Sequence, residues 1–297
     1  MCYNRVEGEL KMQEYVLKNA KSFELKDIFD CGQCFRWNEE QDGSYTGVFK
    51  GNVLNVKKIG KDVYFKGICN GNIKDVVEDY FDLNRDYEKI KQTLAKIDKN
   101  METSVNYGSG IRILNQDLWE TIISFIISAN NNIPRIKGII ERLSKNYGDK
   151  IIWEGKEYYS FPTAKQLKNV TVEEYRKLGL GFRDIRLYET TKMILEKQVD
   201  LENLEKEPNT LIVREELLKL SGVGPKVADC ILLFSDLKRF DVFPIDVWVR
   251  RVMNDLYIKE ADETKVSKKK IEKLAKEKFG DLQGLAQQYL FYWRREA

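Results

Sequence analysis

Two helical patterns meet at a glycine turn in the stretch Leu217-Leu218-Lys219-Leu220-Ser221-Gly222-Val223-Gly224-Pro225-Lys226-Val227-Ala228-Asp229-Cys230. A helix that begins near Arg214 ends at this turn, and proline suits the first position of the next helix because no amide donor is needed there. Gly222 and Gly224 permit a positive φ and leave the amides of the turn uncovered by side chains. Uncovered amides at a helix start bind anions, so the turn is a candidate phosphate site. A plain αα-hairpin without a ligand is the alternative.

The opening turn of the second helix carries a lysine, Lys226. A helix start favours anions, so we expect this amine to lose its proton more easily than an ordinary lysine. A neutral amine is a nucleophile that can attack a sugar carbon and form a Schiff base. A solvated surface lysine is the alternative interpretation.

Asp246 and Cys230 follow at spacings that favour a cavity shared with Lys226. Asp246 lies 20 residues after Lys226, at a helix start predicted just after Pro244. Its carboxylate can cap that helix and can also stabilise positive charge that develops on a sugar. Cys230 follows Lys226 by one helical turn, so both side chains can face the same side of the helix. The spacing therefore predicts a lysine and a carboxylate that act together.

The composition bounds the class of protein. The chain has 297 residues, 42% hydrophobic and 33% charged, which is typical of a soluble globular protein with two or three packed subdomains. The net charge of +3 means that any surface for nucleic acid must be local. Histidine is absent, which excludes serine–histidine nucleophiles and histidine-containing zinc sites. Five scattered cysteines, among them Cys2, suit a reducing cytosol rather than a disulfide framework. We expect no signal peptide and no membrane span.

The predicted fold class is α+β. Residues 1–108 are expected to form a domain with a twisted antiparallel sheet, with strands at 35–37, 44–49, 53–57 and 63–66 and helices at 74–83 and 86–97. Residues 109–297 are expected to form two helical subdomains that contain the helix-hairpin-helix and flank a cleft. The helices predicted there span residues 118–129, 134–147, 163–168, 172–178, 183–197, 209–220, 226–234, 246–256, 264–279 and 283–295.

Further motifs occur in a fixed order along the chain. They are Gly32-Gln33-Cys34-Phe35-Arg36-Trp37, Gln116-Asp117, Ser128-Ala129-Asn130-Asn131-Asn132-Ile133-Pro134-Arg135, Leu178-Gly179-Leu180-Gly181-Phe182-Arg183 and Gly284-Leu285-Ala286-Gln287-Gln288-Tyr289-Leu290-Phe291. With the lysine and aspartate around the hairpin, they resemble the 8-oxoguanine DNA glycosylase family from about residue 28 to the C-terminus. Cys31 and Cys34 also form a C-x-x-C, but no second cysteine pair follows that would favour a metal site.

The resemblance implies catalytic and base-binding roles. Lys226 would attack C1′ of a damaged nucleotide flipped out of the duplex, Asp246 would stabilise the sugar, and β-elimination would then nick the strand. The Gly32 carbonyl would accept the N7 hydrogen of the oxidised base. Cys230 and Phe291 would stack on the two faces of the base, and Gln287 would bind its Watson–Crick edge.

The resemblance also implies roles on the opposite strand. Asn130 would fill the hole left in the duplex. Arg135 and Arg183 would donate to the estranged cytosine, whose acceptors suit an arginine fork, and Phe182 would wedge beside it. Trp248 stands where the animal members have a histidine, so the contacts next to the lesion and the choice of opposite base stay open.

The expected partner is double-stranded DNA containing oxidised guanine, bound by a monomer in the cytoplasm, or in the nucleus of a eukaryote. The resemblance implies no metal or organic cofactor for the chemistry. A structural Na⁺ or K⁺ would be held by the hairpin carbonyls of Leu218, Leu220 and Val223, next to the amides around Gly222 and Gly224. Two alternatives remain: a glycosylase for another damaged base, and a non-catalytic protein that uses the helix-hairpin-helix only to bind DNA.

Overall fold

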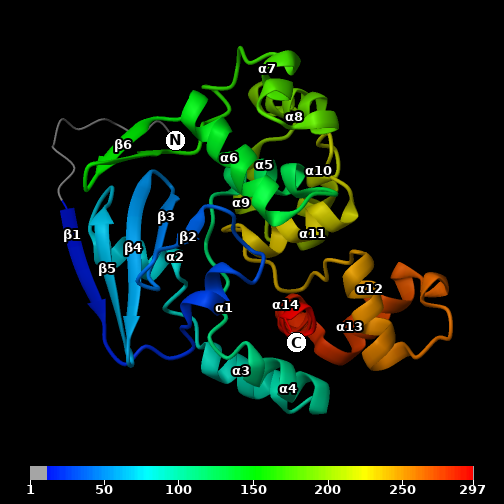
Figure 1. Cartoon of the computed structure of the whole chain (residues 1–297). Helices are drawn as coiled ribbons and strands as arrows, with labels where there is room; N and C mark the ends of the chain where they lie inside the picture. Colours follow the sequence, from blue (N-terminus) through cyan, green and yellow to red (C-terminus); the bar gives the residue numbers. More distant parts are fainter. Residues whose placement is uncertain (1–11, 297) are drawn as a thin grey trace.

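The computed structural model describes residues 12–296, so Cys2 lies outside the described residues. As predicted, the fold is α+β: an antiparallel sheet comes early in the chain, and a largely helical region follows (Figure 1). No helix in the described part is long and apolar enough to cross a membrane.

The N-terminal sheet contains β1 (Met12–Leu17), β2 (Trp37–Glu39), β3 (Tyr45–Phe49), β4 (Asn52–Ile59) and β5 (Asp62–Ile68). Its strands lie in the order β1-β5-β4-β3-β2, and every neighbouring pair is antiparallel. Strands β2 to β5 form the predicted meander, with turns at Gly51 and Gly60, which both have positive φ. Strand β1 was not predicted and covers the edge of β5. Phe35 and Arg36 were predicted to be in a strand, but they lie in the bend before β2.

An aromatic core joins this sheet to helices α1 (Leu25–Phe29) and α2 (Ile73–Tyr80). Trp37 stacks on Phe29 with ring centroids 4.2 Å apart, and Phe49 stacks on Tyr80 at 3.8 Å. Trp37 Nε1 also donates to the Tyr80 hydroxyl at 3.0 Å. Each buried aromatic contributes about 1.5–3 kcal/mol of hydrophobic stabilisation. This core therefore anchors both ends of the 30–36 bend, which contains Gly32.

The remaining helices are α3 (Tyr87–Ala95), α4 (Lys99–Tyr107), α5 (Leu118–Ser128), α6 (Ile133–Tyr147), α7 (Val172–Lys177), α8 (Asp184–Leu195), α9 (Leu201–Lys206), α10 (Thr210–Leu217), α11 (Pro225–Phe234), α12 (Val247–Met253), α13 (Lys268–Phe279) and α14 (Gln283–Glu296). Short 3₁₀ turns are η1 (Gly181–Arg183), η3 (Glu263–Lys265) and η4 (Gly280–Leu282), and η2 (Asn254–Ile258) is a π-turn. Helices α5 and α11 pack together at the centre of the large core and bury nearly all their side chains. Helix α14 packs against α4, α12 and α13 (Figure 1).

In the helical region one predicted helix is absent, and a hairpin is present that was not predicted. Residues 163–168 form turns instead of a helix: one helical bond closes, from Leu167 N to the Thr163 carbonyl at 3.2 Å, and a tighter turn follows, with Lys168 N donating to the Lys165 carbonyl at 3.3 Å. Residues 150–159 form a hairpin of β6 (Lys150–Trp153) and β7 (Lys156–Tyr159). Its two-residue turn is Glu154-Gly155, with φ of 49° and 73°, a geometry usually signalled by Asn-Gly or Asp-Gly. Glutamate in the first position hid the hairpin from the sequence pattern.

The β6–β7 hairpin packs the helical region against the N-terminal sheet. Ile151 and Trp153 pack on Val48, Val53 and Ile68 of the N-terminal sheet. The predicted boundary at residue 108 stays a prediction.

Candidate functional site

The glycine turn joins α10 to α11 as a helix-hairpin-helix. Gly222 has φ of +84°, and a Cβ on it would lie 2.8 Å from Arg186 Cδ, so the turn requires glycine there. Gly224 is the N-cap of α11 and is exposed, and Pro225 occupies the first helical position. Lys226 therefore stands on the first turn of a helix whose position is fixed by the core.

The Lys226 amine is half-buried, and its Nζ lies 5.6 Å from the centroid of the Phe125 ring. The Cys230 thiolate and the Asp246 carboxylate raise the pKa of Lys226 above its ordinary value, and burial opposes them. The expectation that the helix start would ease loss of the proton is therefore wrong for the protein without DNA.

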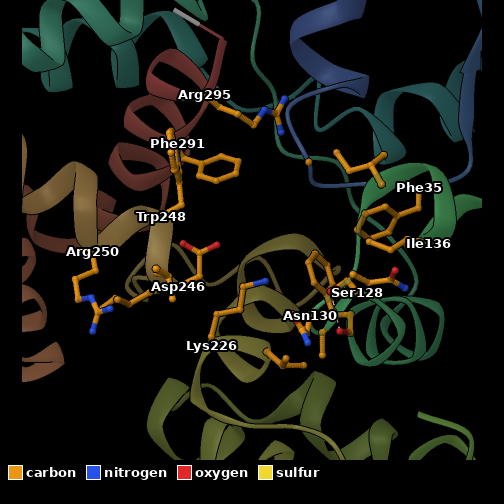
Figure 2. A pocket seen from close by; sticks show the side chains of 18 of the residues that line it. Phe35, Ser128, Asn130, Ile136, Lys226, Asp246, Trp248, Arg250, Phe291 and Arg295 are labelled. Carbon is orange, nitrogen blue, oxygen red and sulfur yellow. Dashed lines mark hydrogen bonds between the residues drawn. The ribbon is translucent and has the colours of Figure 1, made fainter. Parts of the chain in front are cut away.

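The charge that faces Lys226 near neutral pH is that of Asp246. Burial raises the pKa of the Cys230 thiol to about 11, so this thiol is uncharged near neutral pH. Asp246 is the N-cap of α12, as predicted, and its Oδ1 accepts from Val249 N at 2.7 Å. The Lys226 and Asp246 side chains point into one cavity (Figure 2).

This cavity has a volume of about 720 Å³, which lies in the range of ligand sites. Its walls come from the bend around Gly32, from the α5–α6 connection with Asn130, and from α11, α12 and α14. The predicted site residues on these walls are Gly32, Asn130, Lys226, Asp246 and Phe291. Segments nearly 260 residues apart in the sequence therefore meet at one site.

Gly32 sits in a rigid bend that only glycine fits without strain. Its φ is +89°, and a Cβ would lie 3.3 Å from Arg295 Nη1 and 3.7 Å from Phe291 Cε1. Buried Gln33 fixes the bend by donating to the carbonyls of Ile28 and Arg112 at 2.8 and 2.7 Å. The pattern placed Gln33 in a motif but gave it no role.

Cys230 and Gln287 do not lie on the cavity wall. Both are buried, with 3% and 5% of their surfaces exposed. Gln287 Oε1 has no hydrogen-bond partner within the described part of the chain. Phe291 lies one turn further along α14 and does reach the wall (Figure 2). In this conformation the four predicted base-binding residues do not form one open site.

The residues expected to contact the opposite strand differ in exposure. Asn130 is exposed in the left-handed region with φ of 51°, and Phe182 is 54% exposed. Arg135 is exposed and donates to the Gly179 carbonyl at 3.1 Å. Arg183 is buried and donates to the carbonyls of Ala129 and Asn130, at 2.9 and 2.7 Å.

Arg183 thus holds the turn that presents Asn130. Its guanidinium also lies 4.3 Å from the centroid of the Phe182 ring. Its donation to a cytosine stays a prediction.

The hairpin carbonyls that were expected to hold a monovalent cation differ in their hydrogen bonds. Within the described residues, the carbonyls of Leu218 and Val223 accept no hydrogen bond, and the Leu220 carbonyl accepts one from Val223 N at 3.1 Å. Carbonyl oxygens are the ligands that hard cations prefer. A bound cation would add positive charge next to the exposed amides of the turn.

Three cations on the cavity wall were not predicted: Arg250, Lys268 and Arg295. Arg250 follows Asp246 by four residues, so helical spacing was the signal for it. Lys268 belongs to a lysine-rich segment that was interpreted as a solvated helix face. Arg295 donates to the Asp30 carbonyl and lies 5.3 Å from the centroid of the Phe291 ring, a contact between distant segments.

Two family models match the chain. Residues 15–122 match the N-terminal domain of 8-oxoguanine DNA glycosylase, and residues 123–280 match the HhH-GPD superfamily of base excision DNA repair proteins.

Two curated relatives and one solved structure are similar to the chain. A probable N-glycosylase/DNA lyase of Methanothermobacter thermautotrophicus is 30% identical over 245 residues, covering 76% of each chain. The N-glycosylase/DNA lyase of Saccharomyces cerevisiae is 40% identical over 154 residues, covering 48% of this chain but only 41% of the yeast protein. The solved structure is the Clostridium acetobutylicum 8-oxoguanine glycosylase/lyase bound to double-stranded DNA with cytosine opposite 8-oxoguanine. It is 46% identical with a TM-score of 0.89, over 96% of this chain and 98% of that one.

Proposed function

We propose that this chain, which belongs to the 8-oxoguanine DNA glycosylase family, removes 8-oxoguanine from double-stranded DNA through a Schiff base on Lys226. As a member of that family it is a DNA N-glycosylase and lyase. The observation that carries this proposal is the pair of side chains, Lys226 and Asp246, in one cavity of about 720 Å³. The stacked bases of a duplex hide the sugar carbon, so the nucleotide must be flipped into this cavity before attack.

In the reaction, Lys226 Nζ bonds to C1′ while the bond from C1′ to N9 breaks and the base leaves with the electron pair. Positive charge grows on the sugar, and the Asp246 carboxylate stabilises it. The Asp246 carboxylate is held in place by the hydrogen bond that it accepts from Val249 N, so it needs little movement as the charge develops. The attached nitrogen then loses a proton, and the ring bond from C1′ to O4′ breaks as O4′ takes up a proton, which forms a protonated imine. Loss of a proton from C2′ then expels the 3′ phosphate and nicks the strand.

Lys226 must lose its proton before it can attack. Its raised pKa means that the amine is an ammonium in the protein without DNA. A low-dielectric environment disfavours a charged amine, so a substrate that excludes water lowers this pKa. Activation is therefore tied to occupation of the cavity.

Base selection rests on the Gly32 bend in this proposal. The Gly32 carbonyl accepts the N7 hydrogen of 8-oxoguanine, whereas guanine would present a lone pair there. A buried carbonyl left facing a lone pair disfavours guanine by the cost of an unpaired polar group, about 1–3 kcal/mol. Cys230, Gln287 and Phe291 complete the site after a local rearrangement, because Cys230 and Gln287 are buried in the conformation described.

The remaining contacts hold the DNA. Asn130, Arg135, Phe182 and Arg183 would face the opposite strand. The amides around Gly222 and Gly224 would bind phosphate, with a Na⁺ or K⁺ on the carbonyls of Leu218, Leu220 and Val223 adding charge.

We also propose a monomer that works in the cytoplasm, or in the nucleus of a eukaryote. The four cysteines among the described residues are unpaired, which suits a reducing compartment.

The test is a panel of duplexes that each carry one damaged base. The 8-oxoguanine duplex should be cut by the wild-type protein, and Lys226→Gln should bind it without cutting. Cutting of a different lesion, with 8-oxoguanine left intact, would assign the cavity to another damaged base. Binding without cutting by the wild type would mean that the protein binds DNA without catalysing its cleavage.

A further inference from the structure

Helix α12 carries two adjacent arginines with different surroundings. Arg251 Nε pairs with Glu263 Oε1 at 2.8 Å and is absent from the walls of the cavity. Arg250 lines the cavity. Its Nε is buried without a hydrogen-bond partner, and no carboxylate forms an ion pair with it, within the described part of the chain. One arginine is therefore already neutralised, whereas the other faces the cavity without a counter-charge.

Arg250 lies close to the catalytic pair. It follows Asp246, the N-cap of α12, by four residues, which is about 6 Å along the helix axis. In Figure 2, Asp246 lies between Arg250 and Lys226. Lys268, from the first turn of α13, adds a second cation to the same wall.

We propose that Arg250 binds a phosphate that flanks the flipped nucleotide, an inference that rests on the proposed function of the cavity. A sugar whose C1′ lies between Lys226 and Asp246 has its two phosphates only a few bonds away, within reach of a side chain one helical turn further on. A guanidinium can form two parallel hydrogen bonds to a phosphate. Partial burial of a cation is unfavourable unless an anion meets it, and DNA supplies that anion.

This contact positions the sugar. A phosphate held by Arg250 fixes the backbone on the Asp246 side, so that C1′ faces the Lys226 amine. Arg250 is thus a positioning residue for the reaction. An arginine in the last turn of a helix also stabilises the helix C-terminus, but Arg250 and Arg251 share that effect. Arg251 is for this reason the matched control.

The experiment measures DNA affinity as a function of salt in the uncleaving Lys226→Gln background. Each phosphate contact contributes about 0.9 to the slope of log affinity against log salt for duplex DNA. Adding Arg250→Gln should reduce this slope by about one contact, and adding Arg251→Gln should leave it unchanged. Equal slopes for the two variants would overturn the proposal. Thermal melting of both variants checks that each is folded.

A second measurement combines the Arg250→Gln variant with a change in the DNA. One flanking phosphate at a time is replaced in the 8-oxoguanine duplex by an uncharged methylphosphonate. One of the two replacements should weaken binding by protein that retains Arg250, and the same replacement should have no further effect with Arg250→Gln. Additive losses would overturn the proposal. The same comparison is then repeated with a duplex that carries a non-cleavable abasic analogue, which has no base to select. The phosphate contact is thereby tested even if 8-oxoguanine is not the substrate.

Discussion

Replacing Gly32 with alanine should lower excision of 8-oxoguanine by an amount that its cost in stability does not explain. The φ of +89° is a region that alanine avoids, and such backbone strain costs about 1–3 kcal/mol. The new Cβ would meet Arg295 Nη1 at 3.3 Å, but this is the end of a flexible side chain and can move by a few tenths of an ångström. The bend therefore relaxes by rotating its backbone, which turns the Gly32 carbonyl away from the base.

The loss of the hydrogen bond between the base and the Gly32 carbonyl sets the size of the expected fall in excision. A buried bond that is lost at one partner costs about 1–3 kcal/mol, which corresponds to a fall of about 5- to 150-fold in kcat/KM on the 8-oxoguanine duplex. Cleavage of a duplex with an abasic site should stay near the wild-type rate, because it needs no base contact. Single-turnover kinetics on the two duplexes separate these effects.

Gly43→Ala is the control, because Gly43 also has positive φ, +76°, and an added Cβ would meet nothing within 4 Å. It should cost similar stability in a thermal melt and leave excision unchanged. If Gly32→Ala excised 8-oxoguanine as fast as Gly43→Ala, the Gly32 carbonyl would not read the base.

Three further predictions follow from charge and burial. Since Cys230 and Asp246 raise the pKa of Lys226, borohydride trapping on an abasic duplex should increase with pH above neutrality. Asp246→Asn should shift that curve to lower pH, and a flat curve would contradict the assignment. Arg183→Ala should lower the free energy of unfolding by about 2–4 kcal/mol, because it leaves the buried carbonyl of Leu180 and the partly buried carbonyls of the Ala129-Asn130 turn without their donor, as a denaturant titration would show. Burial lowers the pKa of Lys238 to about 7 from 10.5, so the unfolded chain binds more protons between those values and stability should rise with pH there. Lys238→Met should flatten that rise in melts recorded across the range.

Much of the site could be predicted because local rules fix its main residues. Proline after Gly224 sets the start of α11, and with it the position of Lys226. A capping carboxylate sets the start of α12, and with it the position of Asp246. The glycine of the 30–36 bend is needed for its positive φ. These features depend on neighbours within a few residues, so the sequence pattern contains them.

The rest depends on packing between distant segments. The burial of Arg183 follows from how η1 meets the end of α5, which no local pattern reports. The raised pKa of Lys226 follows from Asp246 and Cys230 lying near it in space, whereas the helix-start rule considers the dipole alone. The cavity-facing cations, Arg250 and Arg295, belong to helices whose relative orientation is set by the core.

The central claim is that the Lys226 amine forms the covalent bond to the sugar. The most direct measurement is to treat the wild-type protein with borohydride in the presence of an 8-oxoguanine duplex, digest the adduct and locate the modified residue by mass spectrometry. The account predicts an adduct on Lys226 that disappears in Lys226→Gln. An adduct on a different amine, or no adduct while the base is still released, would contradict it.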